Sequence, residues 1–322
     1  MEEKVRVGVI GVGRLGRFHT QKYAANPGAE LVGVHDSNPQ QGGKVAEENS
    51  CRFFDSIDQL LAGVQAVSIA VPTTLHHEIG LRALEAGCHV LMEKPIAAAS
   101  SEARELVEYA EQKGLWLQVG HIERFNPAVT ALHGLEPAPK FVEAHRLAPY
   151  SPRGADVSVI HDLMIHDIDV LLYLMGREVE RVDASGVPVV SSTADIANAR
   201  VNFSGKRVAN LTASRISLKK LRKFRFFQED AYISLDFEKK RAEIYRRVPR
   251  GTPKSLPIPG ADDKDLRVLT RKTRAKKNDD ALARETDSFL QSVRENRPPA
   301  VDGATALTAL EVVEEIARQC EM

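Results

Sequence analysis

A predicted helix over residues 160–175 carries a histidine and two carboxylates at helical spacing. The residues at i, i+4, i+7 and i+11 share one stripe of an α-helix, opposite an apolar arc that should face a core: Asp162, His166, Asp169 and Tyr173. His166 can act as a general base, with Asp162 orienting it or a substrate. The pattern also fits a solvated helix face on which Asp162 caps the helix or meets its dipole.

Metal and disulfide chemistry have little support in the sequence. His161 and His166 are five residues apart, so they point to different sides of a helix and do not form a zinc pair. Asp167 falls in the apolar arc, which the sequence explains only if an arginine or a second helix face pairs with it. The three cysteines lack paired spacing and favour free thiols in a reducing compartment: Cys51, Cys88 and Cys320.

A glycine-rich segment directly follows the first predicted strand, residues 5–10, and opens a helix. Its pattern is G-x-G-x-x-G, in which the first glycine permits a tight turn and the second lets the backbone approach a pyrophosphate. The third glycine allows close packing of helix on strand, and the phosphates would lie at the positive end of the helix. The predicted binding residues of this segment are Gly11, Gly13, Arg14, Leu15 and Gly16.

Asp36 lies 20 residues beyond Gly16, at the end of the second predicted strand over residues 31–35. A carboxylate at that place can accept hydrogen bonds from the ribose hydroxyls of an adenosine. Ser37 and Asn38 follow it, so no adjacent basic residue is offered to a 2′-phosphate. The sequence therefore predicts NAD rather than NADP. The alternative is a glycine turn without a ligand, with Asp36 as a helix cap.

Lys94 emerges just after the predicted strand over residues 89–92, in the tripeptide Glu93-Lys94-Pro95. Open parallel sheets bind ligands at this carboxyl edge, and the proline ends the strand. A lysine beside a bound nicotinamide could bind a substrate hydroxyl and stabilise the alkoxide that develops there. A lysine at a strand end can also be a simple solvated charge.

The elements that would position these residues indicate two domains, as the length of 322 residues also suggests. Strands and helices alternate in the first part, which predicts a doubly wound parallel sheet of the Rossmann type. Further strands are predicted at 64–71, 89–92 and 115–119, and helices at 75–85 and 101–112. We place this NAD-binding domain at residues 1–122.

Residues 123–322 form the second predicted domain, an α+β unit with a large, open, mostly antiparallel sheet. Apolar and polar residues alternate over 197–203, and similar alternation continues through 208–216 and 224–237. Prolines and basic residues predict an extended loop over 248–278. Two closing helices follow, at about 279–295 and 303–319, and we expect them to be able to pack back on the first domain.

The overall charge gives no reason to expect nucleic-acid or membrane partners. Lys plus Arg and Asp plus Glu number 44 each, and no apolar run approaches the ~20 residues that span a bilayer. The first residues lack the pattern of a signal peptide, so a cytoplasmic protein is expected. Residues 206–277 nevertheless hold 22 basic against 8 acidic side chains. They could attract an anionic substrate, bind nucleic acid, or simply be paired surface positions, which we favour.

Taken together, these motifs resemble the Gfo/Idh/MocA family of oxidoreductases. The resemblance covers nearly the whole chain and rests on five segments in the family's order: Gly11 to Gly16, Val71-Pro72-Thr73 with His76, Glu93-Lys94-Pro95, Asp162-x-x-x-His166, and Arg297-Pro-Pro-Ala-Val-Asp-Gly303. It implies a Rossmann domain joined to an α/β domain whose open sheet forms homodimers or homotetramers. It also implies NAD as cofactor.

The resemblance implies a catalytic trio, Lys94, Asp162 and His166, that oxidises a sugar or cyclitol hydroxyl to a ketone. Either His166 or Lys94 would take the hydroxyl proton. Further contacts to the cofactor are implied for Val71, Thr73, His76, Glu93 and Gln118.

Two further segments, 120–127 and 146–156, are similar to family members that act on UDP-N-acetylglucosamine at carbon 3. Such enzymes supply a 3-keto sugar to an aminotransferase, for lipid A or a surface polysaccharide. The predicted substrate residues are Arg124, Asn126, Arg146, Tyr150, Arg153 and Asp169, of which Arg146 and Arg153 could bind the diphosphate.

The sequence thus predicts an NAD-dependent dehydrogenase of a sugar hydroxyl, with the C3 hydroxyl of UDP-N-acetylglucosamine as the substrate group. Myo-inositol or an aldose is the alternative within the same reaction. An NAD-assisted glycosidase and a non-catalytic NAD-sensing module are alternatives of other classes.

Overall fold

The computed structural model describes residues 3–151, 157–258, 267–273, 275 and 279–321. The chain divides into two compact units, each described by itself below. The first comprises Met1–Ile122 and Asp280–Leu310, and the second comprises Glu123–Asp279 and Glu311–Met322. No helix in the described part of the chain is long and apolar enough to cross a membrane.

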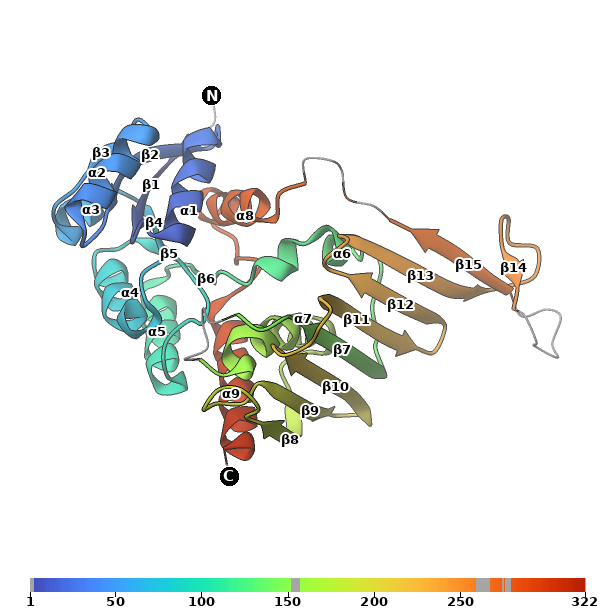
Figure 1. Ribbon diagram of the computed structural model, residues 1–322. Helices are drawn as coiled ribbons and strands as arrows, with labels where there is room; N and C mark the ends of the chain where they lie inside the picture. Colours follow the sequence, from blue (N-terminus) through green and yellow to red (C-terminus); the bar gives the residue numbers. More distant parts are fainter. Residues whose placement is uncertain (1–2, 152–156, 259–266, 274, 276–278, 322) are drawn as a thin grey trace. The chain divides into compact units, whose positions relative to one another are not determined.

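The first unit is built on a six-stranded sheet in the order β3-β2-β1-β4-β5-β6, with every described pair parallel (Figure 1). This order places a topological switch point between β1 and β4, where doubly wound sheets bind ligands. Its strands are β1 (Val5–Ile10), β2 (Ala29–His35), β3 (Arg52–Phe53), β4 (Ala66–Ile69), β5 (His89–Met92) and β6 (Leu117–Val119).

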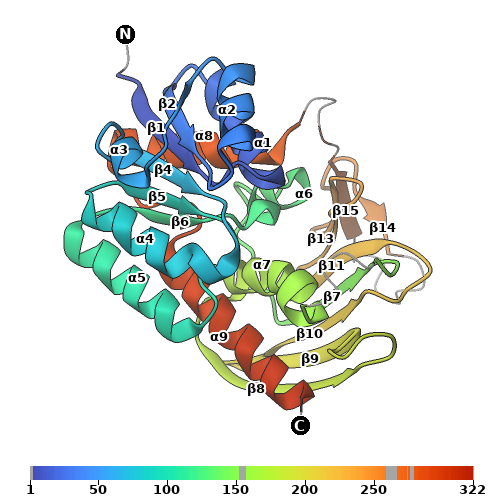
Figure 2. The ribbon, with the colours of Figure 1, turned by 60° about the vertical axis from the view of Figure 1, so that its left-hand side comes forward.

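Helices cover both faces of this sheet, as continuous apolar strands require. Figure 2 shows α4 and α5 side by side on one face. Helices α1, α2 and α8 pack on the other, where Tyr23, Phe289 and Leu290 join the core over β1. The helices are α1 (Arg14–Ala25), α2 (Pro39–Glu48), α3 (Ile57–Leu61), α4 (His76–Glu85), α5 (Ser100–Lys113) and α8 (Ala281–Glu295), with the short 3-10 turn η1 (Thr73–Leu75).

The second unit is built on a nine-stranded sheet in the order β14-β15-β13-β12-β11-β7-β10-β9-β8. All neighbours are antiparallel except β7 and β10, which are parallel. The strands are β7 (Phe141–Leu147), β8 (Val179–Val187), β9 (Ile196–Phe203), β10 (Arg207–Ser214), β11 (Leu221–Gln228), β12 (Ala231–Asp236), β13 (Arg241–Val248), β14 (Leu256–Pro257) and β15 (Arg267–Lys272).

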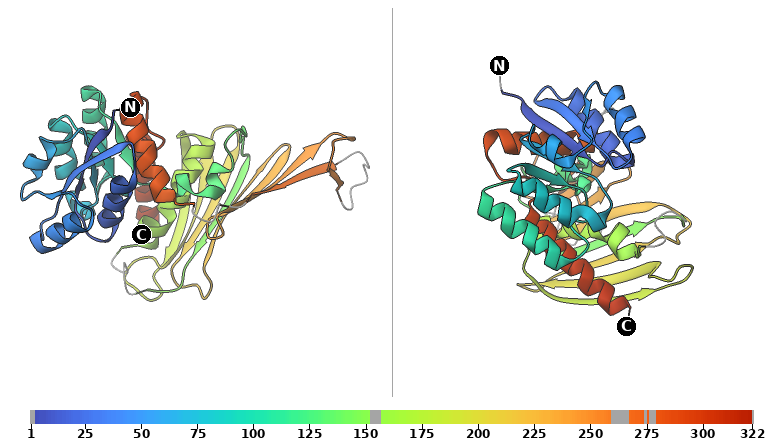
Figure 3. Two further views of the ribbon diagram at one scale, coloured as in Figure 1. Left: turned by 90° about the horizontal axis from the view of Figure 1, so that it is seen from above. Right: turned by 90° about the vertical axis from the view of Figure 1, so that its left-hand side faces the viewer.

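Helices line one face of this sheet, as the left view of Figure 3 shows. They are η2 (Ile122–Phe125), α6 (Pro127–Thr130), η3 (Ile160–Met164), α7 (Ile165–Met175) and the second half of α9 (Gly303–Cys320). Side chains alternate accordingly: Ala199 and Val201 are buried, whereas Asn198 and Arg200 are exposed. The predicted alternation over 197–203 is therefore confirmed.

One expectation about local structure is wrong, and a second is confirmed with a difference in its first turn. The segment after residue 248 is not all loop, because β15 pairs along its whole length with residues 243–248 of β13. The helix predicted over 160–175 is not one regular helix, because it begins with the π-helical turn η3 and becomes α-helical at Ile165. A π turn changes the angular spacing of side chains, and such turns are frequent at functional sites.

Candidate functional site

The glycine segment turns at the carboxyl end of β1 into helix α1. Gly11 has a left-handed φ of +79°, and a Cβ there would lie 2.7 Å from Cγ1 of Val71. A Cβ on Gly16 would lie 1.8 Å from the Gly11 carbonyl oxygen. The fold itself therefore requires glycine at these two positions.

Gly13 differs, because the protein around it has space. The nearest side-chain atom to a Cβ at Gly13 would be 3.9 Å away. No acidic side chain stands in the first turn of α1, and no side chain caps it. An open backbone at the positive end of a helix fits the approach of a pyrophosphate.

A cavity of about 370 Å³ lies beside this turn, at the carboxyl ends of β1, β2 and β4. It is the switch point of the sheet, the place at which a dinucleotide binds in this architecture. The lining is Ile10, Gly11, Gly13, His35, Asp36, Ser37, Ile57, Ala70, Val71, Pro72, Leu75, Glu78 and Ile79. The residues present therefore fit the adenosine half of NAD.

Asp36 is held in place at the rim of that cavity. Its Oδ2 accepts from the backbone N–H of Val12 at 2.7 Å, and its Oδ1 accepts from Asn38 at 2.8 Å. Each carboxylate oxygen can accept a second hydrogen bond, so two fixed acceptors remain available to ribose hydroxyls.

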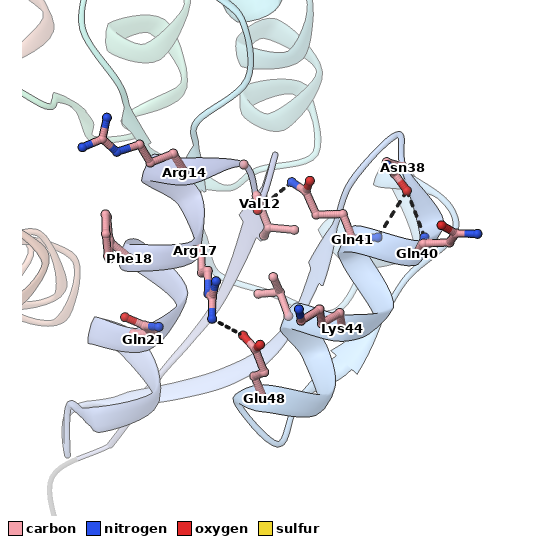
Figure 4. Close-up of a pocket in the computed structure, with 12 residues that line it drawn as sticks. Val12, Arg14, Arg17, Phe18, Gln21, Asn38, Gln40, Gln41, Lys44 and Glu48 are labelled. Carbon is pink, nitrogen blue, oxygen red and sulfur yellow. Dashed lines mark hydrogen bonds and ion pairs between the residues drawn. The ribbon is translucent and has the colours of Figure 1, made fainter.

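A second, more open pocket of about 800 Å³ lies on the far side of Gly13, between α1 and α2 (Figure 4). Arg17 pairs with Glu48 at 2.9 Å, and Nε2 of Gln41 donates to the Val12 carbonyl at 2.9 Å. Arg14 lines this pocket and, in Figure 4, extends away from the Arg17–Glu48 pair. The predicted cofactor residue Arg14 thus stands beside the phosphate turn rather than in the adenosine cavity.

Lys94 follows β5 at the same carboxyl edge of the sheet, as predicted, and is half-buried. Its backbone N–H donates to Oε2 of Glu93 at 3.2 Å. The other oxygen of Glu93 lies 2.9 Å from Nε2 of His19. Burial acts to raise the pKa of Glu93, but the hydrogen bond and charge of His19, the Lys94 N–H and the Lys94 charge together hold it below its usual range.

His76 is buried behind the same turn. Its Nδ1 lies 2.8 Å from the Pro95 carbonyl oxygen and its Nε2 lies 3.0 Å from that of Val71. Burial lowers the pKa of His76, opposed by these two carbonyl contacts and by Glu93. Both ring nitrogens are occupied by main-chain groups, so His76 shapes the predicted cofactor pocket by tying its loops together.

The other predicted cofactor residues differ in whether they lie at the 370 Å³ cavity. Val71 lines the 370 Å³ cavity, and Thr73 begins the 3-10 turn that follows it. Leu15 is exposed on the first turn of α1. Gln118 is fully buried and donates to the Glu285 carbonyl at 3.4 Å, so its side chain faces α8.

The second unit holds the other two residues of the predicted trio. Asp162 is exposed on the π turn, and His166 is half-buried at the start of α7. The third residue of the trio, Lys94, belongs to the first unit. In the described residues no group of three or more His, Cys, Asp and Glu side chains could hold a metal ion.

Arg124, Asp169 and Tyr173 form a cluster within the second unit. The Arg124 guanidinium lies 4.0 Å from the centre of the Tyr173 ring, and its Nη1 lies 3.5 Å from Oδ1 of Asp169. Asp169 is fully buried, whereas Tyr173 is exposed. The structure therefore brings two predicted substrate residues, Arg124 and Asp169, into contact with Tyr173, the last residue of the predicted polar stripe on α7.

Two other predicted substrate residues do not fit that role. Arg146 is only 2% exposed, and all three of its nitrogens donate at 2.9 Å, two to Asp167 and one to Glu123. This pairing supplies the arginine partner that Asp167 needs. Burial acts to lower the pKa of Arg146, but these two carboxylates raise it above its usual value. The diphosphate contact predicted for Arg146 is wrong in this arrangement, because the guanidinium is buried and bound.

Asn126 is likewise a structural residue. Its Oδ1 accepts from Ala128 and so caps helix α6, while its Nδ2 donates to Glu123 at 2.9 Å and to the Phe237 carbonyl at 3.2 Å. It is buried and bonded at both ends of its amide. The substrate contact predicted for Asn126 therefore has no support.

Tyr150 is exposed beyond β7, and Arg153 lies outside the described residues. The described basic residues from Lys206 onward lie on strands of the sheet and in the turns between them, and several pair with acidic neighbours. Examples are Lys220 with Glu238 at 2.8 Å and Arg225 with Glu143 at 3.0 Å. This favours the interpretation of the segment as a paired surface.

The sequence analysis missed His19, which reaches Glu93 from α1. One signal was available: His19 follows Gly16 by three residues, on the face of α1 that must pack against the sheet. A histidine at such a position needs partners for its two nitrogens.

Comparisons with known proteins agree with this architecture. Residues 5–121 match an oxidoreductase family with an NAD-binding Rossmann fold, and residues 139–234 match the Gfo/Idh/MocA C-terminal domain. The chain is 43% identical to a UDP-N-acetylglucosamine 3-dehydrogenase of Acidithiobacillus ferrooxidans, over 95% of this chain and 94% of that protein. It is 28% identical to a scyllo-inositol 2-dehydrogenase of Bacillus subtilis, over 67% and 69% respectively.

A solved structure of the Acidithiobacillus ferrooxidans UDP-N-acetylglucosamine 3-dehydrogenase superimposes with a TM-score of 0.88, covering 99% of this chain and 98% of that one at 41% identity. A dehydrogenase structure from Clostridium difficile at 20% identity shares the fold, with a TM-score of 0.82 over 98% and 99% of the two chains. The predicted fold class is confirmed.

Proposed function

Because the chain belongs to the Gfo/Idh/MocA family of NAD-binding oxidoreductases, we propose that it oxidises the C3 hydroxyl of UDP-N-acetylglucosamine to a ketone. The observation that carries this proposal is the 43% identity, over almost the whole chain, with a UDP-N-acetylglucosamine 3-dehydrogenase. Inositol dehydrogenases are similar over shorter stretches, such as 58% of this chain at 33% identity. A nucleotide sugar is therefore favoured over a free polyol.

NAD, when bound, supplies the acceptor for the hydride that leaves C3 of the sugar. In this proposal the backbone around Gly13 receives the pyrophosphate, and Asp36 receives the adenosine ribose. Both residues line the cavity at the switch point of the first sheet. The NAD-binding family to which residues 5–121 belong supports this assignment.

The hydroxyl proton goes to a base on this chain, either His166 or Lys94. Loss of the C3 hydride and the hydroxyl proton leaves a ketone, a reduced cofactor and one protonated side chain. The amine of Lys94 also binds the oxygen on which charge develops, and Asp162 orients His166 or the sugar. The position of Lys94 at the carboxyl edge of the first sheet supports its part in this proposal.

Substrate binding is assigned to Arg124, Asp169 and Tyr150, with Arg153 for the diphosphate. Arg124 is the best supported, because Asp169 and Tyr173 hold its guanidinium in place. A planar guanidinium fixed in this way can donate several directed hydrogen bonds to hydroxyl or phosphate oxygens.

We propose in addition that the keto product passes to an aminotransferase and that the enzyme works in the cytoplasm.

We also propose that the enzyme forms a homodimer or homotetramer. The oligomer is supported by a row of four neighbouring aromatic rings on the helix-free side of the second sheet, of which the last three are stacked: Phe141, Phe227, Tyr232 and Tyr245. Light scattering on the purified protein measures its size.

The experiment that tests the activity follows NADH absorbance after NAD is mixed with the enzyme and UDP-N-acetylglucosamine. Glutamate and an aminotransferase acting on the 3-keto sugar draw off the unstable product. Parallel reactions contain myo-inositol and simple aldoses. Signal with the nucleotide sugar alone is the expected result.

Other outcomes separate the alternatives. Turnover of a polyol alone overturns the nucleotide sugar but keeps the dehydrogenase reaction. Release of sugar from a glycoside without net NADH indicates a glycosidase. NAD binding with no chemistry on any of these compounds indicates a sensing module.

A further inference from the structure

A side chain on the first turn of α2 reaches back to the glycine turn, within the first unit. Nε2 of Gln41 donates to the carbonyl oxygen of Val12 at 2.9 Å, as the dashed line in Figure 4 marks. The N–H of Val12 donates to Oδ2 of Asp36 at 2.7 Å. The N–H and the carbonyl of one residue belong to two successive peptide groups. Both peptide groups between Gly11 and Gly13 are therefore fixed by side chains that follow β2.

The two glycines explain what this fixation achieves. Glycine adopts more backbone conformations than any other residue, so a turn with glycine on both sides of Val12 is intrinsically mobile. The Val12 carbonyl and the N–H of Gly13 belong to one trans peptide group, in which they point in opposite directions. The bond from Gln41 thus turns the Gly13 N–H away from the pocket between α1 and α2, which Gln41 lines.

Gln41 is itself held by the loop from which it extends. Oδ1 of Asn38 accepts from the N–H groups of Gln40 and Gln41 at 3.1 Å and 3.2 Å, so Asn38 caps α2. The N–H of Asn38 donates to Oδ1 of Asp36 at 2.8 Å. Val12, Asp36, Asn38 and Gln41 are therefore joined in a closed ring of hydrogen bonds. The ring ties the turn after β1 to the turn after β2.

Gln41 supports the glycine turn from the side opposite the predicted adenosine site. Gly13 and Asp36 line the cavity of about 370 Å³, whereas Gln41 lines the pocket on the far side of Gly13. The nearest atom to a Cβ at Gly13 would be Nε2 of Gln41, at 3.9 Å. Gln41 can therefore act on the turn without occupying the cavity.

We propose that Gln41 is a positioning residue for NAD, which holds the turn at Gly13 in the conformation that receives the pyrophosphate. A turn that is ordered in advance loses less conformational freedom when the cofactor binds, so the affinity rises without a contact between Gln41 and NAD. The place of the pyrophosphate in this inference rests on the proposed function. Asp36 acts on the same turn through the N–H of Val12.

Two neighbouring positions of α2 provide matched variants. Gln41→Met keeps the length of the side chain and loses the donor, and the two residue types have similar helix propensities. Gln41→Lys keeps a donor but adds a positive charge. Gln40 lines the same pocket and points away from Val12 in Figure 4. Gln40→Met and Gln40→Lys therefore make the same chemical changes without touching the bond to Val12.

The first measurement is calorimetry of NAD binding, which needs no turnover. We expect Gln41→Met to raise the Kd for NAD by about 3-fold to 10-fold, the scale of one hydrogen bond. Gln40→Met should stay within about twofold of the unchanged protein, and Gln41→Lys within about twofold of Gln40→Lys. A Kd for Gln41→Met no higher than that for Gln40→Met overturns the proposal.

The second measurement uses fragments of the cofactor, in competition with NAD. ADP carries the adenosine and both phosphates, whereas adenosine carries no phosphate. Gln41→Met should weaken ADP by about the same 3-fold to 10-fold factor as NAD, and adenosine by less than about twofold. General damage to the domain, or a displaced Asp36, would weaken adenosine as much as ADP. That result also overturns the proposal.

The third measurement is hydrogen exchange of backbone amides, read by mass spectrometry on peptides covering residues 10–16 and 101–112. Without ligand, the first peptide should exchange severalfold faster in Gln41→Met than in Gln40→Met, because the turn opens more often. Saturating NAD should remove most of that difference. The second peptide, from α5, is the control and should not change. Equal exchange of residues 10–16 in the two variants rejects the positioning role.

These readouts separate failure of the positioning role from failure of the proposed function. If the unchanged protein oxidises no sugar but the variants show this pattern with NAD and ADP, the positioning role stands and the function fails. If the unchanged protein oxidises the nucleotide sugar while Gln41→Met binds NAD and ADP normally, the function stands and the positioning role fails. In the active enzyme, KM for NAD should rise with Kd while kcat stays within about twofold. A fall in kcat with an unchanged KM for NAD overturns the proposal.

Discussion

Each unit holds a buried network of polar and charged side chains, and the two networks differ in where they end. In the second unit, Arg146 is enclosed by Glu123 and Asp167, and three hydrogen bonds join the arginine to its two carboxylates. In the first unit, hydrogen bonds run from Tyr23 through Ser68 to His19 and end on Glu93, one residue before Lys94. One network closes on itself, and the other leads to a side chain at a ligand-binding edge.

The difference teaches that burial and charge do not by themselves mark a functional residue. Each of the three nitrogens of the buried Arg146 donates to a carboxylate, and the guanidinium has almost no exposed surface on which a ligand could bind. The network that ends on Glu93 instead lies next to a half-buried lysine, at the carboxyl edge where a parallel sheet binds ligands. The following predictions test this contrast, from the largest expected effect to the smallest.

Replacing Arg146, the centre of the network with Glu123 and Asp167, should lower the free energy of unfolding more than any other change proposed here. Arg146→Met leaves the Glu123 and Asp167 carboxylates buried without their cation, and we expect the free energy of unfolding to fall by about 3–5 kcal/mol. Denaturant titration measures it. Arg181→Met removes an exposed ion pair with Asp183 and should cost about 0–1 kcal/mol. A loss for Arg146→Met no larger than this control would show that the network is not needed.

Removing the amine of Lys94, next to the network that ends on Glu93, should instead lower the turnover rate. For Lys94→Met we expect kcat to fall by about 100-fold or more, the scale of an acid-base group, with little change in unfolding. The control is Lys113→Met on the surface of α5. Full activity of Lys94→Met, measured by NADH absorbance, would remove Lys94 from the reaction.

The cofactor site should show an intermediate effect. Asp36→Ala removes two acceptors for the ribose, and we expect the Kd for NAD to rise by about 10-fold to 100-fold, since hydrogen bonds to charged groups contribute about 1.5–3 kcal/mol. Discrimination against NADP should relax. Calorimetry measures both affinities, with Asp58→Ala on the exposed pair with Arg82 as control. An unchanged preference between the cofactors would argue against Asp36 as the ribose acceptor.

The smallest effect concerns acid stability. The folded protein holds the pKa of Glu93 below its usual range. The stabilisation that results is fully present above the unfolded pKa of about 4.3 and is lost as pH falls through the lower folded value. Glu93→Gln should therefore flatten the loss of stability between about pH 5 and pH 3, whereas Glu105→Gln should not. Unfolding curves of both variants across this pH range measure the difference. A loss of stability as steep in Glu93→Gln as in Glu105→Gln would contradict the prediction.

Much of the fold could be predicted because local patterns and tertiary structure agree. The strand over 89–92 and the alternation over 197–203 are read directly from periodicity. Strand β15 could not be predicted, since its pairing with β13 depends on distant hydrogen bonds and the segment before it is rich in proline. The π turn at Asp162 was missed for a related reason, because composition does not distinguish it from an α-helical turn.

The site divides in the same way. The turn and packing roles of Gly11 and Gly16 and the place of Asp36 after β2 were predictable because they follow from backbone geometry within one strand-turn-helix-strand unit. The contact of Asp36 with a ribose stays a prediction. Arg146 and Asn126 were misassigned because residue type shows what a side chain can bind but not what it already binds. Their partners lie on other elements and are known only once the chain has folded.

Helix α8 has a consequence for how this protein is made. Phe289 and Leu290 help to cover the sheet that the first residues of the chain begin to build. Between Ile122 and these residues, the ribosome must add the greater part of the second unit. At about 5–20 residues per second, that takes on the order of ten to thirty seconds. During that interval the apolar residues of the nascent Rossmann sheet that α8 covers in the folded protein stay exposed. A chaperone that binds apolar surface can bind them during this time.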